Sequence, residues 1–368
     1  MTGSRSSRGL KPFLGAAFLL VLAGHPQSLP AAEPTEKAEK ERTKQPELPP
    51  LTATIPPEEA LAAIKRRAMK ILEARRAARR LKFSGEVSQT IAYETNPSTS
   101  SSHKGDTSEE TATYLTLSKK LTPMLDWSSS YSGSYLKYVN YGDGDYTDHT
   151  WTATKLRWQP RRMWRVESWL DLEYNYYPTA KDSTYRNFKT VSRIRQNLFG
   201  SWYHQLQYEY FVRDYATKNA RNGAGAETLS DRVDRRNRLR YKVGATVKKA
   251  LLSVENDLYR NDSNDQRNDF YDYDVWKITG SASGNVTKKL YLSSSFAFER
   301  KNYRARKVTG INAEARYDDK YSITSGVSYD LNDAWKVAYD FSFDHLGSNE
   351  PTGEYDNAKY ALKLTARF

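Results

Sequence analysis

Residues 164–176 read WRVESWLDLEYNY, and two kinds of side chain alternate along this stretch. The first row consists of Trp164, Val166, Ser168, Leu170, Leu172, Tyr174 and Tyr176, and the second of Arg165, Glu167, Trp169, Asp171, Glu173 and Asn175. Successive side chains of a β-strand point to opposite faces of the sheet, so this period of two predicts a strand. One face is apolar and the other mostly charged, so we expect one to meet lipid and the other water.

The same period of two continues from Phe83 to the last residue, Phe368. It is clear again in 202–213 (WYHQLQYEYFVR) and in 335–344 (WKVAYDFSFD). The pattern predicts a single all-β domain, residues 83–368, with about fourteen strands. The count is open by two around residues 300–320. The register is open by one residue in the strands that begin near Phe83 and Ser134, and a slip there would exchange the two faces.

Short and long connections alternate along this domain. The short turns lie near 121–124, 158–163, 199–201, 248–251, 286–289 and 331–334, and the longer polar loops include 94–110, 216–235, 300–320 and 346–356. This order places all turns at one end of the strands and all loops at the other. It is typical of an antiparallel up-and-down transmembrane β-barrel with periplasmic turns, whereas a soluble sandwich has no reason to separate them.

The aromatic residues support a membrane location. The chain has 27 Tyr, 12 Phe and 8 Trp although 27% of its residues are charged. Trp residues gather beside the predicted turns, as at Trp127, Trp164 and Trp335, and Tyr residues gather towards the loops, as at Tyr138 and Tyr210. Two aromatic girdles are expected where a barrel crosses the two membrane interfaces.

The last strand, residues 358–368 (AKYALKLTARF), places Tyr360, Leu362, Leu364 and Phe368 on one row and ends on an aromatic residue. It resembles the terminal assembly signal of bacterial outer-membrane proteins. With the pattern of 83–368, the chain resembles Gram-negative outer-membrane β-barrels of the broad porin-like class. The resemblance implies an outer-membrane location, contact with membrane lipid and lipopolysaccharide, and recognition by the barrel assembly machinery.

The N-terminal region divides into three segments. Residues 1–32 combine basic residues, the apolar run FLGAAFLLVLA at 13–23 and small residues at 31–32, which predicts a secretory signal peptide. Residues 33–55 are charged and contain Pro, which indicates a flexible periplasmic linker. Residues 56–82 predict a basic amphipathic helix. This helix has several interpretations: a plug or gate, a contact for a periplasmic partner, a segment on anionic headgroups, or a solvated stalk.

The charged row of the predicted strands supplies the candidate site. The basic candidates are Lys189, Arg193, Arg195, Arg236, Arg238, Arg240 and Lys242, and the nearby acidic ones are Glu167, Asp171 and Glu173. Fixed positive charge would attract anions into a water-filled channel. Opposite charges on adjacent strands would instead pair and brace the wall. The sequence leaves both interpretations open.

Other classes of function find less support. The net charge of +13 is spread along the chain rather than gathered in one patch, so we expect no nucleic-acid partner. The five His residues give few candidate bases, and the adjacent Asp344 and His345 would point to opposite faces of a strand. No cofactor motif or metal-ligand spacing is present in the sequence. We therefore expect neither an enzyme nor a cofactor.

These observations favour an outer-membrane channel for small hydrophilic solutes, and the basic rows suggest anions among them. The alternative is a barrel that serves export of a polysaccharide or a surface protein, with the helix at 56–82 as its periplasmic contact. A barrel with a blocked lumen is a third hypothesis, because fourteen strands permit a pore without requiring it to be open.

Overall fold

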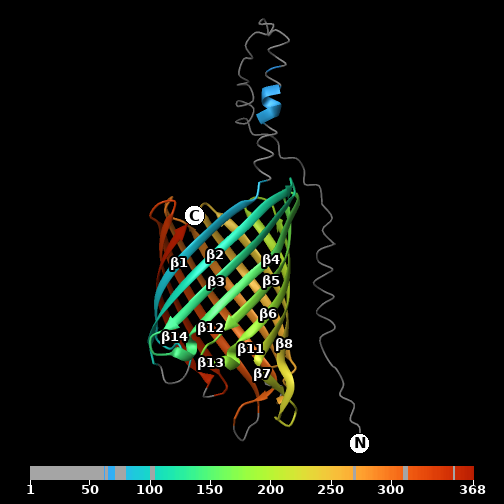
Figure 1. Ribbon diagram of the computed structural model, residues 1–368, viewed down its shortest axis with the longest axis vertical. Helices are drawn as coiled ribbons and strands as arrows, with labels where there is room; N and C mark the ends of the chain where they lie inside the picture. Colours follow the sequence, from blue (N-terminus) through green and yellow to red (C-terminus); the bar gives the residue numbers. More distant parts are fainter. Residues whose placement is uncertain are drawn as a thin grey trace, which may run out of the picture. The chain divides into compact units, whose positions relative to one another are not determined.

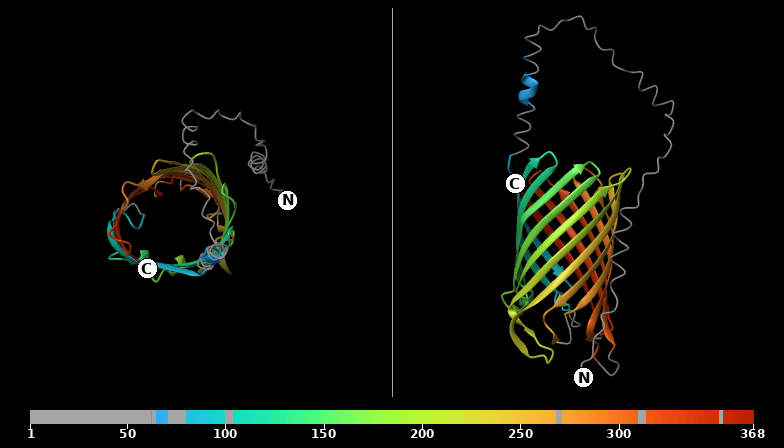
Figure 2. Two further views of the ribbon diagram at one scale, coloured as in Figure 1. Left: turned by 90° about the horizontal axis from the view of Figure 1, so that it is seen from above. Right: turned by 90° about the vertical axis from the view of Figure 1, so that its right-hand side faces the viewer.

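The computed structural model describes residues 62, 65–70, 80–99, 104–267, 271–309, 314–350 and 353–368. Fourteen antiparallel strands form a closed barrel in which each strand pairs with its neighbours in sequence (Figure 1). The first and last strands pair with each other over nine residue partners, from Glu86 with Arg367 to Glu94 with Lys359, and so close the ring (Figure 2). The predicted all-β, up-and-down barrel of fourteen strands is confirmed.

The strands are long enough to cross a membrane at a tilt. Their bounds are β1 (Lys82–Glu94), β2 (Asp106–Thr122), β3 (Leu125–Tyr138), β4 (Tyr146–Arg161), β5 (Trp164–Tyr176), β6 (Tyr185–Asn197), β7 (Trp202–Arg221), β8 (Glu227–Val247), β9 (Ala250–Ser263), β10 (Tyr273–Asn285), β11 (Leu290–Lys307), β12 (Ala315–Asp330), β13 (Trp335–Ser348) and β14 (Tyr355–Arg367). Short 3-10 turns, η1 (Gly142–Gly144) and η2 (Lys181–Ser183), lie in two of the loops.

The two faces of the wall are chemically opposite, as the alternation predicts. Large apolar side chains point outward, among them Ile91 at 53% exposed and Leu258 at 49%. Charged side chains on the inner face are buried among one another, with Glu167 at 3% and Asp257 at 2% exposed. An apolar exterior and a polar interior invert the order of a soluble protein, and suit a wall that has lipid outside and water inside.

The register of β1 and β3, which the sequence leaves open, places their odd-numbered residues outward. Phe83, Val87 and Ile91 on β1 are exposed, as are Tyr131 and Tyr135 on β3. The even-numbered residues of both strands therefore face the lumen, by which we mean the interior side of the barrel.

Several predicted boundaries differ from the structure, and cross-strand pairing explains the differences in the loops, among them 94–110, where β2 already begins at Asp106. The predicted loop 216–235 is mostly a hairpin, because β7 continues to Arg221 and β8 begins at Glu227. The predicted loop 300–320 shortens in the same way, since β11 reaches Lys307 and β12 begins at Ala315. The sequence at the loop ends of these strands is polar and rich in turn-forming residues, so it did not predict the backbone pairing there. The predicted helix 56–82 ends too late, because Lys82 belongs to β1.

Residues 65–70 are helical, in agreement with the predicted helix. The remainder of 56–79, apart from Ala62, lies outside the described residues, as do the predicted signal peptide 1–32 and linker 33–55. Among the described residues, no helix is long and apolar enough to cross a membrane.

A bulge in β4 changes which residues face the lumen. The pairing of β4 with both β3 and β5 shifts register just after Thr152. Thr152 lines the lumen before the shift, and Lys155 and Arg157 line it after, although their numbers differ in parity. An extra residue in one strand reverses the alternation beyond it. The bulge thereby turns two cations inward, which the alternation alone does not predict.

The predicted assembly signal forms part of the closing strand. Tyr360, Leu362 and Leu364 point outward on β14. Phe368 exchanges backbone hydrogen bonds with Gly85 of β1, at 2.9 and 3.0 Å, and its ring lies 6.2 Å from that of Phe83. The terminal aromatic residue therefore packs at the seam where the two ends of the sheet meet. Its recognition by assembly machinery stays a prediction.

Two glycines on the same face of β10 should respond differently to substitution. A Cβ atom at Gly284 would lie 2.5 Å from the backbone oxygen of Lys249, whereas a Cβ at Gly280 would meet nothing within 4 Å. We expect Gly284→Ala to lower the free energy of unfolding by about 1–3 kcal/mol through overpacking. Gly280→Ala should leave it unchanged or raise it. Urea titration of the protein in phospholipid vesicles, followed by Trp fluorescence, measures both; equal losses would contradict the prediction.

Candidate functional site

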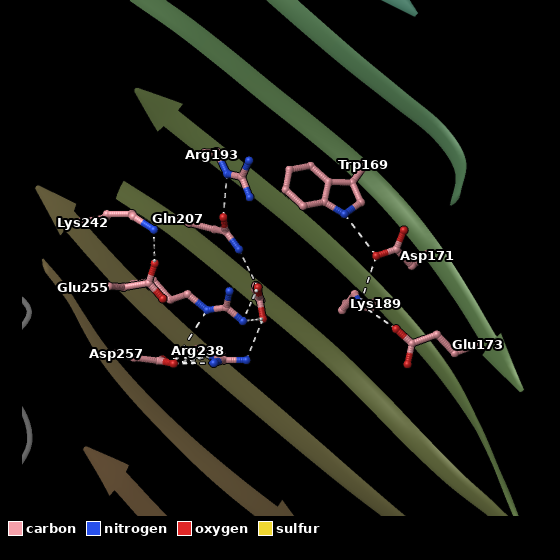
Figure 3. Close-up of polar contacts among 12 residues, drawn as sticks. Trp169, Asp171, Glu173, Lys189, Arg193, Gln207, Arg238, Lys242, Glu255 and Asp257 are labelled. Carbon is pink, nitrogen blue, oxygen red and sulfur yellow. Dashed lines mark hydrogen bonds and ion pairs between the residues drawn. The ribbon is translucent and has the colours of Figure 1, made fainter. Parts of the chain in front are cut away.

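A band of charged side chains covers the lumen face of five adjacent strands, β5 to β9. Acidic and basic strands alternate in this band, which we call the belt. Its members are Glu167, Asp171 and Glu173 on β5, Lys189 and Arg193 on β6, Glu209 on β7, Arg238, Arg240 and Lys242 on β8, and Glu255 and Asp257 on β9. Figure 3 shows side chains of the belt directed toward one another across the strands, among them Lys189 with Asp171 and Glu173, and Arg238 with Asp257. Each basic strand therefore has an acidic strand on both sides.

Carboxylates of β5 hold the cations on both of its neighbours. Glu167 accepts a hydrogen bond from Arg157 Nε at 2.9 Å and forms an ion pair with Arg193 at 3.2 Å. Lys189 Nζ lies 3.1 Å from Asp171 and 2.5 Å from Glu173. Because Arg157 faces the lumen only through the β4 bulge, that bulge completes the pairing of Glu167.

The pairing continues across β7, β8 and β9. Glu209 lies 3.0 Å from Arg240 and 3.6 Å from Arg238. Arg238 also binds both carboxylate oxygens of Asp257. Lys242 lies 3.5 Å from Glu255. Five of the seven basic residues predicted from the sequence thus have a carboxylate within 4 Å, a geometry that favours the bracing interpretation for them.

Arg236 is held differently, by aromatic rings. Its guanidinium lies 4.5 Å from the ring centre of Phe211 and 4.7 Å from that of Tyr259, and it donates a hydrogen bond to the Tyr273 hydroxyl at 2.8 Å. Lys301, on β11, has a similar environment: its Nζ lies 3.9 Å from the ring centre of Tyr273 and 4.5 Å from that of Tyr303.

The aromatic rings position these two cations without neutralising them. A ring attracts a cation through its quadrupole and carries no net charge, so the rings do not compensate the charge of Arg236 or of Lys301. Among the described residues, neither lies within ion-pair distance of a carboxylate. We call them the ring-held cations. Lys301 was not among the residues predicted from the sequence; the mixture of Tyr and basic residues at 300–306 (RKNYRAR) was the available signal.

A second pair of cations lies towards the turn end of the lumen. Arg165 of β5 and Arg195 of β6 are direct cross-strand partners. The Arg195 guanidinium stacks 3.7 Å from the ring centre of Tyr203, and its Nε donates to Asn197 at 3.2 Å. Arg165 Nε is buried without a hydrogen-bond partner among the described residues. Like charges directly opposite each other destabilise a sheet, so this pair contributes positive charge rather than bracing.

Asp344 and His345, the residues considered for catalysis, have different hydrogen-bond partners on opposite faces of β13. Asp344 accepts a hydrogen bond from Ser322 at 2.6 Å and pairs with Lys320 at 3.1 Å. His345 points to the other face, where its Nδ1 lies 2.7 Å from Asp356 of β14. Strand alternation separates the two, as expected. Within the described part of the chain, no group of three His, Cys, Asp or Glu residues is placed to hold a metal ion.

The closed antiparallel wall, its apolar exterior and its charged lumen define a transmembrane β-barrel of the outer-membrane type. Solved structures of outer-membrane proteins are similar to this barrel. OmpT of Vibrio cholerae, folded in vitro, matches at 8% identity with a TM-score of 0.47, over 78% of this chain and 97% of that chain. An anion-selective porin from Comamonas acidovorans matches at 10% identity with a TM-score of 0.42, over 78% and 99%.

A bacterial polysaccharide outer membrane secretin also matches, at 9% identity with a TM-score of 0.42, over 77% of this chain and 98% of that chain. No protein-family model matches the chain, and no curated protein sequence matches it.

Removing one belt carboxylate should destabilise the wall. Asp257→Asn takes a charge partner from Arg238, which would then share Glu209 with Arg240. We expect the free energy of unfolding in vesicles to fall by about 1–3 kcal/mol, the cost of an uncompensated, half-buried charge. The control Asp182→Asn changes an exposed loop residue and should have no effect. An equally stable Asp257→Asn variant would show that the belt does not brace the barrel.

Proposed function

We propose that the protein is an outer-membrane channel for small hydrophilic solutes with a preference for anions. The observation that carries this proposal is the contrast between the two kinds of lumen cation. Belt cations are neutralised by carboxylates, whereas the ring-held cations and the Arg165 and Arg195 pair are not. Uncompensated charge in a water-filled passage raises the local concentration of the opposite ion.

The lumen wall beside the belt supports passage of hydrophilic solutes. On β10 to β13 the inward rows are rich in small hydroxyl residues, namely Thr279, Ser281, Ser283, Ser293, Ser295, Ser322, Thr324, Ser328 and Ser342. Ser253 contacts Ser281, and Ser295 contacts Thr324, each at 2.6 Å. In the ring of fourteen strands β10 adjoins β9 of the belt, whereas β12 and β13 lie seven strands from β5 and β6 and so face that part of the belt across the lumen. Short hydroxyl side chains leave space and offer hydrogen bonds to a hydrated solute.

A measurement of ion selectivity tests which cations of the lumen set the preference for anions. In Arg236→Gln/Lys301→Gln the lumen loses two positive charges that are held by aromatic rings rather than by carboxylates. We expect the anion-to-cation permeability ratio to fall about two- to fivefold, since each charge acts through water at short range. The reversal potential of single channels in planar bilayers under a potassium chloride gradient measures the ratio.

A double variant that removes one positive and one negative charge gives the matched control. Lys242→Gln/Glu255→Gln removes an ion pair and leaves the net charge of the lumen unchanged. Its reversal potential should equal that of the unaltered protein. If both double variants shift the reversal potential equally, or neither does, the ring-held cations do not set selectivity. A folded barrel that shows no conductance would exclude the channel itself.

A further inference from the structure

A cavity of about 770 Å³ lies among the loop-end residues of β7, β11 and nearby loops. Four cationic residues line it: Arg221, Arg267, Arg306 and Lys307. Tyr271 and Thr309 are also part of its lining. We call this space the mouth cavity. None of these six residues was a candidate from the sequence, because they come from three separate segments that only the closed barrel brings together.

The two carboxylates of the mouth cavity are already engaged. Glu350 accepts hydrogen bonds from the Thr309 hydroxyl and from the Thr309 amide, the latter at 2.9 Å. These bonds hold the pKa of the Glu350 carboxyl below its ordinary value, so it stays ionised and bound to Thr309. Asp265 is 2% exposed and accepts a hydrogen bond from the Arg267 amide at 3.1 Å. The two carboxylates keep their negative charge, and four cationic residues outnumber them, so the lining has a net positive charge.

The mouth cavity connects to the ring-held cations through one tyrosine. The Arg306 guanidinium lies 5.2 Å from the ring centre of Tyr303, and Lys301 Nζ lies 4.5 Å from the same ring. Arg316 lies 5.1 Å from this ring but is paired with Asp318, which also accepts a hydrogen bond from the Tyr303 hydroxyl at 2.9 Å, so Arg306 and Lys301 carry the charge on the two sides of Tyr303. Positive charge therefore continues from the cavity at the loop end to Lys301 and Arg236 in the lumen. A solute with several negative groups in a row could contact the cavity and the ring-held cations in succession.

The cavity is too large for a simple inorganic anion. A water molecule occupies about 30 Å³, and pockets for organic ligands range over about 300–1,000 Å³. The lining offers guanidinium groups, which bind oxyanions with two parallel hydrogen bonds, and the phenol of Tyr271. Beyond it lies the hydroxyl wall of β10 to β13. This combination suits a solute that carries oxyanions and many hydroxyl groups, in other words an acidic sugar chain.

We propose that the mouth cavity binds acidic oligosaccharides at the loop end of the barrel, through carboxylate or sulfate groups that contact Arg267, Arg306 and Lys307. This inference rests on the proposed channel and names its solute class. The shared chemistry is an oxyanion on a sugar ring, and the experiment distinguishes the two sources of that oxyanion.

Blocking of single-channel current tests the proposal. Trigalacturonate supplies carboxylates, a sulfated trisaccharide supplies sulfates, and maltotriose is the neutral sugar of similar size. We expect an acidic trisaccharide added on the loop side to interrupt the current at concentrations at least about tenfold below those for maltotriose, since charge-assisted hydrogen bonds are roughly twice as strong as neutral ones. Whichever acid blocks at lower concentration identifies the oxyanion. Equal blocking by all three sugars would overturn the proposal.

Two triple variants locate the site. Arg267→Gln/Arg306→Gln/Lys307→Gln should weaken blocking by the acidic sugar about tenfold or more, because three contacts to oxyanions are lost. The control Lys104→Gln/Lys137→Gln/Arg186→Gln removes the same charge from exposed loop-side positions outside the cavity and should be blocked like the unaltered protein. If the two variants weaken blocking equally, the effect is one of net charge and the cavity is not the site.

A binding measurement separates this inference from the proposed channel. Isothermal titration of the detergent-folded protein with trigalacturonate or the sulfated sugar needs no conductance. Suppose that the unaltered protein binds the acidic sugar, that the cavity variant does not, and that the barrel shows no conductance. This outcome would retain the mouth cavity as a binding site and exclude the channel. Conductance with no binding of either acidic sugar would overturn the mouth cavity and retain the channel.

Discussion

The structure depends on the requirement that every backbone N–H and C=O in lipid has a hydrogen-bond partner within the protein. An open sheet would leave unpaired groups along both edges, at a cost of several kcal/mol for each group in hydrocarbon. Pairing of β1 with β14 removes both edges at once. All other features follow from this closure, because a closed wall has one face for lipid and one for water. The period of two then assigns every strand residue to one of them.

Closure also places the charged side chains of the inward rows opposite each other across neighbouring strands, where like charges would repel. The arrangement of charges in the belt avoids this repulsion. Alternation of acidic strands (β5, β7 and β9) with basic strands (β6 and β8) gives each belt cation a carboxylate on at least one neighbouring strand, and gives Arg238 and Arg240 one on both. The exceptions have a different physical basis. Arg236 and Lys301 rest on aromatic rings, and Arg165 directly opposes Arg195, so positive charge persists at these positions.

Two arrangements of cations thus serve two purposes in one lumen. Paired cations stabilise the wall and contribute little net field, whereas cations on tyrosine rings keep their field and are held in place. The same tyrosine chemistry extends to the loop end, where Tyr303 lies between Lys301 and Arg306. The proposed preference for anions and the proposed binding of acidic sugars both follow from this difference, although they concern different residues.

The sequence by itself determined the barrel, because alternation and the order of turns and loops are local properties. Rows such as 164–176 are readable without knowing any partner strand, and they establish which face each belt residue occupies. Tertiary structure decided which charges are compensated, since pairing depends on register between strands such as β8 and β9. It also decided the inward turn of Lys155 and Arg157, because a bulge is visible only against its partner strands. The role of Lys301 and the mouth cavity emerged in the same way, since closure alone brings their residues together from separate segments.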